Sequence, residues 1–224
     1  RLVDGDDKLS SDWGEYSTKT REAVFYYDVR MRSPDRLIET DTLHYDTRTS
    51  VAHITGKSKI TSNQGIIYTD DGFFDSKQDK ARLYNRSTVI NEGKTIVGDS
   101  LYFDDNTGVA EGFGNVVYID TQNKNELRCG HLNYNKISGY GYATVDALMK
   151  DFSQEDTLYL HGDSIKLYTY DINTDSVYRV VHCFDKVRAY RTDMQAVCDS
   201  LVFSSKDSCL TMYRDPIVWN AGRQ

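Results

Sequence analysis

Residues 99–114 read D-S-L-Y-F-D-D-N-T-G-V-A-E-G-F-G, and this stretch decides the fold because two other stretches repeat its pattern. Residues 41–56 read D-T-L-H-Y-D-T-R-T-S-V-A-H-I-T-G, and residues 70–85 read D-D-G-F-F-D-S-K-Q-D-K-A-R-L-Y-N. From the first Asp, which we call the anchor, Leu or Gly follows at offset two, an aromatic residue at four, Asp at five, Ala at eleven, and Gly or Asn at fifteen. Such self-similarity indicates a repeat architecture.

Three weaker copies follow, with anchors at Gly130, Asp163 and Asp199. The spacing between successive anchors grows from 29 residues to 31, 33 and then 36, so the later repeats are longer. Gly and Asn at offset fifteen are the residue types that best tolerate unusual backbone angles.

Apolar and polar residues alternate after each anchor. Leu43 and Tyr45 fall on one face and His44 on the other, and a period of two is the signature of a β-strand. Turn-forming residues such as those at 105–108 separate the alternating stretches. Each repeat is therefore expected to form two antiparallel strands of about ten residues.

The predicted fold class is all-β, an elongated antiparallel sheet of about six two-strand repeats, folded over like a jelly roll or a taco. A flat sheet of that many strands would curl or fold so that its apolar faces meet. We expect these faces to form one inner wall, whose predicted members are Leu43, Tyr45, Ile54, Ile60, Phe74, Leu83, Leu101, Phe103, Leu132, Ile165, Leu201 and Phe203.

Two domains are expected: a flexible N-terminal arm over residues 1–22, which are charged and polar and lack the repeat, and a single repeat domain over residues 23–224. Val24 to Met31 is expected to form the first strand. The stretch from Asp146 to Asp156 breaks the alternation, which favours a helical turn or a loop insertion. Because the first residue is Arg1 and not Met, we expect a processed or excised piece whose signal peptide is already gone.

Composition excludes several classes of protein. The formal net charge of -7 and the absence of a Lys/Arg stripe speak against a nucleic-acid partner, because phosphate neutralisation needs clustered positive charge. A mean hydropathy of -0.60, without an apolar run near 18 residues, excludes a transmembrane helix. The 17 tyrosines suit pleated, half-buried surfaces.

The cysteines and histidines give no sign of a metal or another cofactor. No C-x-x-C spacing occurs among Cys129, Cys183, Cys198 and Cys209, so zinc and thioredoxin-like chemistry are not expected. Cys129 and Cys198 each directly precede an anchor, so we expect them to share a face, and the sequence leaves a disulfide open.

No catalytic motif is present, so an enzyme is not expected. The sequence lacks H-E-x-x-H, G-x-S-x-G and a phosphate-binding glycine loop. His44 and His53 occupy repeat positions that hold Tyr102 and Glu111 in another copy, which indicates interchangeable rather than catalytic residues. With 34 acidic residues, catalytic carboxylate pairs stay open. A carbohydrate-active parallel β-helix is the enzymatic alternative, and the short turns favour antiparallel pairing instead.

The order D-x-L-x-Y-D, a turn, x-A-x-x-x-G and an apolar strand resembles the OstA-type repeat. This repeat occurs in the periplasmic lipopolysaccharide-transport proteins LptA and LptC and in the N-terminal domain of LptD. The stretches from Ile66 to Asp75, Gly93 to Asp104 and Gly108 to Ile119 carry the resemblance best; it covers residues 36–135 well and 136–215 loosely. The greater length, stretched later repeats and extra cysteines indicate a divergent relative or a fragment of a larger protein.

The resemblance implies a periplasmic protein of a Gram-negative bacterium, with association to the outer membrane left open. It implies that the inner-wall residues line an apolar groove for the acyl chains of lipopolysaccharide or a related lipid. It also implies end-to-end strand pairing with other OstA-like transport proteins, and it allows a homo-oligomer. The alternative is a structural β-repeat scaffold or adhesin with a filled core. The basic residues Lys57, Lys59, Arg82 and Arg86 are expected on outer faces, where they meet lipid phosphates or solvent.

Overall fold

The computed structural model describes residues 1–63, 65–172 and 174–220, and in these residues it contains 19 β-strands and no helix. The strand pairings are antiparallel, which confirms the predicted all-β antiparallel fold. Within the described residues there is accordingly no helix able to cross a membrane. The chain forms two compact units, unit 1 (Arg1–Asn106) and unit 2 (Thr107–Gln224).

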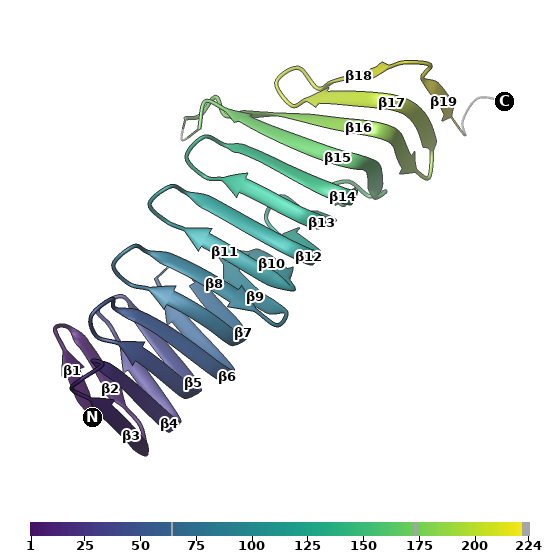
Figure 1. Ribbon diagram of the computed structural model, residues 1–224. Helices are drawn as coiled ribbons and strands as arrows, with labels where there is room; N and C mark the ends of the chain where they lie inside the picture. The colour runs from purple at the N-terminus through teal and green to yellow at the C-terminus, as the bar shows by residue number, and fades with distance from the viewer. Residues whose placement is uncertain (64, 173, 221–224) are drawn as a thin grey trace. The chain divides into compact units, whose positions relative to one another are not determined.

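Unit 1 is built around four long neighbouring strands, β4 to β7, flanked by shorter ones (Figure 1). β2 and β3 both pair with β4, and β8 and β9 both pair with β7. β11 then pairs with β8, and β10 with β9. The strands are β1 (Leu2–Asp4), β2 (Asp7–Ser10), β3 (Trp13–Ser17), β4 (Glu22–Arg32), β5 (Arg36–Asp46), β6 (Val51–Ser62), β7 (Gly65–Asp75), β8 (Lys80–Tyr84), β9 (Ser87–Asn91), β10 (Lys94–Gly98) and β11 (Ser100–Asp104).

Unit 2 is a meander in which each strand pairs with the next along the chain, from β12 to β17. β18 and β19 then pair with the two ends of β17. The strands are β12 (Val109–Asp120), β13 (Asn125–Asn135), β14 (Tyr140–Asp151), β15 (Leu158–Tyr170), β16 (Tyr178–Arg191), β17 (Met194–Ser204), β18 (Cys209–Tyr213) and β19 (Ile217–Asn220).

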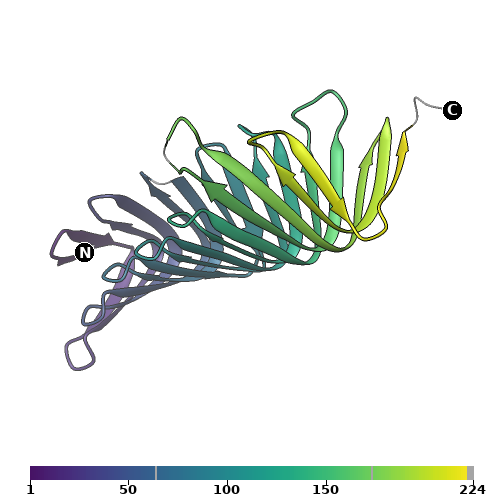
Figure 2. The same cartoon turned by 90° about the horizontal axis from the view of Figure 1, so that it is seen from above.

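The long strands of each unit bend midway, so that the sheet of that unit folds over into two arms (Figure 2). The pairing register shifts at the bend, for example between Thr55 and Ser58. Such bulges bend a strand and increase its twist. The repeat residues at offset fifteen lie here with left-handed backbones, at φ values of +89° for Gly56, +58° for Asn85 and +70° for Gly114. The residue types at offset fifteen therefore mark the bend.

The residues at offset five close the hairpins between strands. Asp75 Oδ1 accepts hydrogen bonds from the backbone N–H groups of Lys77 and Gln78, at 3.0 and 2.9 Å. Asp46 does the same for Arg48 and Thr49 in the preceding turn. Short polar side chains favour turns through such local bonds. The repeated acids at this offset therefore have a structural role.

Residues 1–22 do not form the flexible arm that we expected. Leu2–Asp4 pairs with β2, and β2 and β3 pair with β4. Leu9 is 1% exposed in the core, and Ser33 Oγ donates a hydrogen bond of 2.6 Å to Asp7. These strands are only 3 to 5 residues long, too short to show the alternation that a sequence pattern needs.

Two other boundaries differ from the expectation. β14 continues to Asp151, so residues 146–151 extend a strand instead of forming a helical turn or a loop, and only residues 152–157 lie between strands. Residues 23–224, expected to form a single repeat domain, are divided between two compact units, because the unit boundary falls after Asn106. The repeat pattern continues across this point and therefore conceals the division. Val24 to Met31 lies within β4, as predicted.

Candidate functional site

The predicted inner-wall residues of each unit fall on one face of its sheet. Paired residues of neighbouring strands point to the same side. In unit 1, Leu43 pairs with Ile54, and Leu83 pairs with Leu101. In unit 2 the same pairing joins Leu132 to Ala143 and then to Ile165. Sequence alternation therefore identifies this face correctly in both units.

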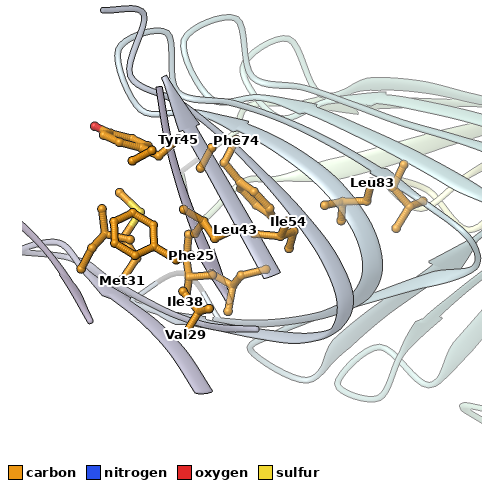
Figure 3. Close-up of a cluster of buried hydrophobic side chains, with 14 residues drawn as sticks. Phe25, Val29, Met31, Ile38, Leu43, Tyr45, Ile54, Phe74 and Leu83 are labelled. Atoms are coloured by element: carbon orange, nitrogen blue, oxygen red, sulfur yellow. The ribbon is translucent and has the colours of Figure 1, made fainter. Parts of the chain in front are cut away.

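In unit 1 this face carries a cluster of buried apolar side chains (Figure 3). Leu43, Ile54 and Leu83 are each 0% exposed, and Tyr45 is 2% exposed. Phe103, the least buried of the predicted residues in this unit, packs against the cluster. The buried cluster comprises Leu9, Ala23, Phe25, Val29, Met31, Ile38, Leu43, Tyr45, Ala52, Ile54, Ile60, Phe74, Leu83 and Leu101.

Buried hydroxyl groups line the bend of unit 1. Ser58 Oγ donates to Thr40 Oγ1 at 2.7 Å, and Thr69 Oγ1 and Ser87 Oγ share a hydrogen bond of the same length. Thr40 and Thr69 each directly precede an anchor. Because a buried polar group must be hydrogen-bonded to be tolerated, these pairs satisfy one another and leave no demand for a polar ligand.

In unit 2 the corresponding face has no charged side chain between the strand ends, and its residues at the bend are small. We call it the apolar face. Following the pairing register, its members between the strand ends are Ala110, Gly112, Val116, Tyr118, Leu127, Cys129, Leu132, Tyr134, Gly141, Ala143, Ala147, Met149, Leu160, Gly162, Ile165, Leu167, Val181, Cys183, Val187, Ala189, Ala196, Cys198, Leu201 and Phe203.

Among the hydrogen bonds described for unit 2, none joins two hydroxyl groups at the bend. The positions before its anchors are Cys129, Gly162 and Cys198, where unit 1 has Thr40 and Thr69. A Cβ at Gly162 would lie only 2.5 Å from Cys183 Sγ, so the thiol occupies the space above this glycine. The bend of unit 2 is therefore lined by small, apolar side chains.

The arms of unit 2 leave larger apolar side chains only half-buried. Among the predicted residues, Ile165 and Leu201 are buried, whereas Leu132 and Phe203 are partly exposed. The sequence prediction missed further half-buried members of the same face, including Met149. Their alternation within long strands was the available signal, but the stretched spacing of the later repeats obscured it.

Burial keeps the thiols of the apolar face neutral. Burial raises the pKa of Cys129 to about 11. Burial, followed by the neighbouring Cys198, raises the pKa of Cys183 to about 12. All four cysteines are free, and Cys129 and Cys198 share this face, as their positions before the anchors suggested. At neutral pH the apolar face therefore bears no thiolate charge.

The outer faces carry the histidines and the basic residues. His53 Nε2 lies 2.9 Å from Asp71 Oδ1, and His161 Nε2 lies 2.6 Å from Asp146 Oδ1. The Arg86 guanidinium forms an ion pair of 3.0 Å with Asp99. Lys57 and Lys59 are exposed and Arg82 lies 5.5 Å from the centre of the Tyr102 ring. No group of three or more metal-ligating side chains occurs in the parts of the chain that the structure describes.

Comparison with known families gives one match within the chain. Residues 1–41 match the family model described as OstA-like protein. The chain carries an OstA-like segment. This segment coincides with β1 to β4 and part of β5, and it includes the region where we had expected an arm. The match therefore adds an N-terminal stretch, residues 1–41, to the OstA-type resemblance seen in the later repeats.

Solved structures and curated proteins add little more. The crystal structure of LptH from Pseudomonas aeruginosa, the LptA homologous periplasmic component of the conserved lipopolysaccharide transport device, is 17% identical, with a TM-score of 0.44. The alignment covers 54% of this chain and 82% of that chain. Among curated proteins, none matches the sequence.

Proposed function

We propose that this chain is a non-enzymatic, lipid-binding protein of lipopolysaccharide transport and outer-membrane assembly. The observation that carries the proposal is the uncharged apolar face of unit 2, which presents partly exposed Leu132 and Phe203 beside small residues at the bend. The OstA-like match over residues 1–41 supports lipopolysaccharide or a related lipid as the ligand.

An apolar face suffices for this function, because a lipid that crosses water must keep its tails out of it. Each buried CH₂ contributes about 0.8 kcal/mol, so a chain of about twelve carbons contributes on the order of 10 kcal/mol. Sheltering such a chain needs no catalytic group and no cofactor. It needs only apolar side chains with surface left to bury.

The family match also supports a periplasmic location in a Gram-negative bacterium, at or near the outer membrane. Partners would be other OstA-like proteins or further copies of the chain, joined end to end by strand pairing. Among the described pairings, β3 pairs only with β4 and β19 only with β17. Ile217 and Trp219 on β19 are each 51% exposed. Unpaired strand edges readily accept another strand.

The test is mass spectrometry of lipid extracted from the purified chain, together with binding of added lipopolysaccharide. We expect bound lipid in the wild type and a loss of at least tenfold in affinity for Leu132→Asp. The matched control is Ile137→Asp, because Ile137 is 64% exposed in a turn. Wild-type protein that neither contains lipid nor binds added lipopolysaccharide would refute the proposal.

A structural scaffold without ligand is the second candidate, and the buried cluster of unit 1 favours it. That cluster holds 14 buried residues and lies beside satisfied hydroxyl pairs. A scaffold would show the same unfolding midpoint with and without added lipid. A lipid-binding protein must be stabilised, because a ligand that binds only the folded state adds about 2.7 kcal/mol at a concentration 100 times its Kd.

A further inference from the structure

We infer that the outer face of unit 2 binds a saccharide chain, through a row of aromatic side chains on one arm of the folded sheet. The row crosses the neighbouring strands β12 to β16, on the face opposite the apolar face. We call it the aromatic strip, and its members are Phe113, His131, Tyr140, Tyr142, Tyr168, His182 and Phe184. The inference goes beyond the proposed function and does not depend on it, because the proposed lipid site is on the other face of the sheet.

Ring contacts join the members of the aromatic strip without a gap. Between neighbouring strands the ring centres lie 4.4 to 5.4 Å apart. Phe113 and His131 stack face to face, whereas the planes of the other neighbouring rings are inclined by 47° to 83°. Each inclined ring therefore turns part of its face away from its neighbour. Since strands lie about 4.8 Å apart, the strip offers such ring surface along about 20 Å.

The aromatic strip lies on an uncovered face. In the part of the chain that the structure describes, β12 to β16 contact their neighbours in the sheet, and no further layer packs over them. Phe113 is 42% exposed, and the other members are half-buried. The hydroxyl groups of Tyr140, Tyr142 and Tyr168 form no hydrogen bond with another described residue. Ring surface and hydroxyl groups are therefore both accessible to a ligand.

Side chains that form hydrogen bonds lie directly beside the rings. Asn133 pairs with Tyr142 in the register, and its Nδ2 donates a hydrogen bond of 2.7 Å to Glu111 Oε1. Lys166 pairs with Tyr142 from the other side, and its Nζ lies 5.2 Å from the centre of the Phe184 ring. Amide, carboxylate and ammonium groups together supply donors and acceptors. The two charges are of opposite sign, so the strip suits a ligand without a high charge density.

This combination selects a saccharide as the occupant. The C–H groups on the face of a sugar ring pack on the electron-rich face of an aromatic ring, and the hydroxyl groups at its rim bond to amides and carboxylates. The spacing of the rings between strands is close to the length of one sugar unit in an extended chain. An acyl chain would leave the polar groups of the strip without partners, and a nucleic acid would need clustered positive charge.

The test compares two leucine substitutions in the full chain. Tyr168→Leu removes the central ring of the strip, which lies 5.1 Å from Tyr140 and 5.2 Å from His182. The matched control is Tyr190→Leu, because Tyr190 forms a similar cross-strand pair with Tyr159, at 6.2 Å, on the outer face of the other arm. Aromatic pairs stabilise a sheet even without a ligand, so the unfolding midpoint is measured in parallel.

Two lipid-free probes distinguish the source of the saccharide, and calorimetric titration measures their affinities. A hexamer of N-acetylglucosamine represents a cell-wall glycan, and the core oligosaccharide released from lipopolysaccharide represents the sugar of that lipid. We expect the wild type to bind one of them and Tyr168→Leu to lose about fivefold in affinity, the loss typical of one ring contact. Tyr190→Leu should stay within about twofold. Equal affinity of Tyr168→Leu and wild type would overturn the inference, as would an equal loss in Tyr190→Leu or wild-type protein that binds neither probe.

The native histidines provide a second measurement, which does not depend on the folding of Tyr168→Leu. His131 and His182 belong to the strip, whereas His161 lies on the outer face of the other arm, beside Asp146. Bound saccharide should shift the ring C–H signals of His131 and His182 in the NMR spectrum and leave those of His161 unchanged. The signals are assigned with His131→Gln, His161→Gln and His182→Gln. Unchanged signals of His131 and His182 at saturating probe would overturn the inference, whereas failure to bind lipid would refute the proposed function alone.

Discussion

Single residues at the bend show how the repeat tolerates exceptions. In one copy, a Cβ at Gly56 would lie 2.8 Å from Asp41 Oδ2, so the glycine makes room for the anchor. In another copy the roles are exchanged. The anchor is Gly130, and the residue at offset fifteen is Val145, whose Cβ would lie 2.7 Å from a Cβ at Gly130. In both of these pairs a glycine makes room for the larger partner, whereas the pair of Asp70 and Asn85 contains no glycine.

Val145 has an unfavourable backbone conformation for a β-branched residue, and burial of its side chain does not offset this cost. Its φ is +65° and it is 65% exposed, so a β-branched residue holds a left-handed backbone with little burial in return. We expect Val145→Gly to raise the free energy of unfolding by about 1 kcal/mol, measured by urea denaturation, because left-handed φ values cost L-residues about 1–2 kcal/mol. The control Val117→Gly, on a regular strand, should destabilise by about 1 kcal/mol. Equal losses of unfolding free energy in both variants would contradict the interpretation that Val145 is strained.

At the scale of elements, the hairpins are held by their own side chains and by one another. Each turn lies beside the turn of the next repeat. In unit 1 the N–H of Asp105 donates to the carbonyl of Asp79 at 3.0 Å, and in unit 2 that of Lys136 donates to Gly108 at 2.9 Å. These hydrogen bonds between successive turns order the turns, in addition to the hydrogen bonds between the strands.

The turn of β7 offers a direct measure of this local contribution. Asp75→Ala removes the acceptor of two backbone N–H groups, those of Lys77 and Gln78. We expect it to lower the free energy of unfolding by about 1 kcal/mol, since each hydrogen bond contributes little net of water. Gln78→Ala, in the same turn, should change stability by less than about 0.5 kcal/mol. Urea denaturation with unchanged m-value measures both, and comparable effects of the two substitutions would argue against a special role for Asp75.

The elements could be predicted where the repeat is strict. Alternation and the turn residues predict the long strands and their turns between Asp41 and Asn135, because each depends on local preferences of a few residues. The expected strands of about ten residues are wrong for residues 80–104, which the structure divides into β8 to β11, each of five residues. The short strands β1 to β3 escaped prediction, because their stability comes from pairing with β4 and from burial of Leu9. Whether an apolar face leaves room for a ligand depends on side chains from several strands, so pattern alone could not decide it.

At the scale of the whole molecule, the negative net charge of the protein must repel the proposed anionic ligand. The chain has a formal net charge of -7, and lipopolysaccharide bears phosphate. Repulsion between like charges lowers affinity most at low ionic strength, where fields extend furthest. Burial of the acyl tails has to outweigh this repulsion. The salt dependence of binding therefore separates the contribution of the tails from that of the head group.

Salt should therefore strengthen binding of lipopolysaccharide instead of weakening it. Raising the ionic strength from about 0.01 to 0.15 M shortens the Debye length from about 30 to 8 Å. We expect several-fold tighter binding, measured by displacement of parinaric acid, a fatty acid that fluoresces in apolar surroundings, after correction for its own salt dependence. A neutral monoacylglycerol is the matched ligand, and its affinity should change by less than about twofold. Weaker binding of lipopolysaccharide at high salt would instead indicate that exposed cations such as Lys57 and Lys59 attract the phosphates, and would move the head group to the outer face of unit 1.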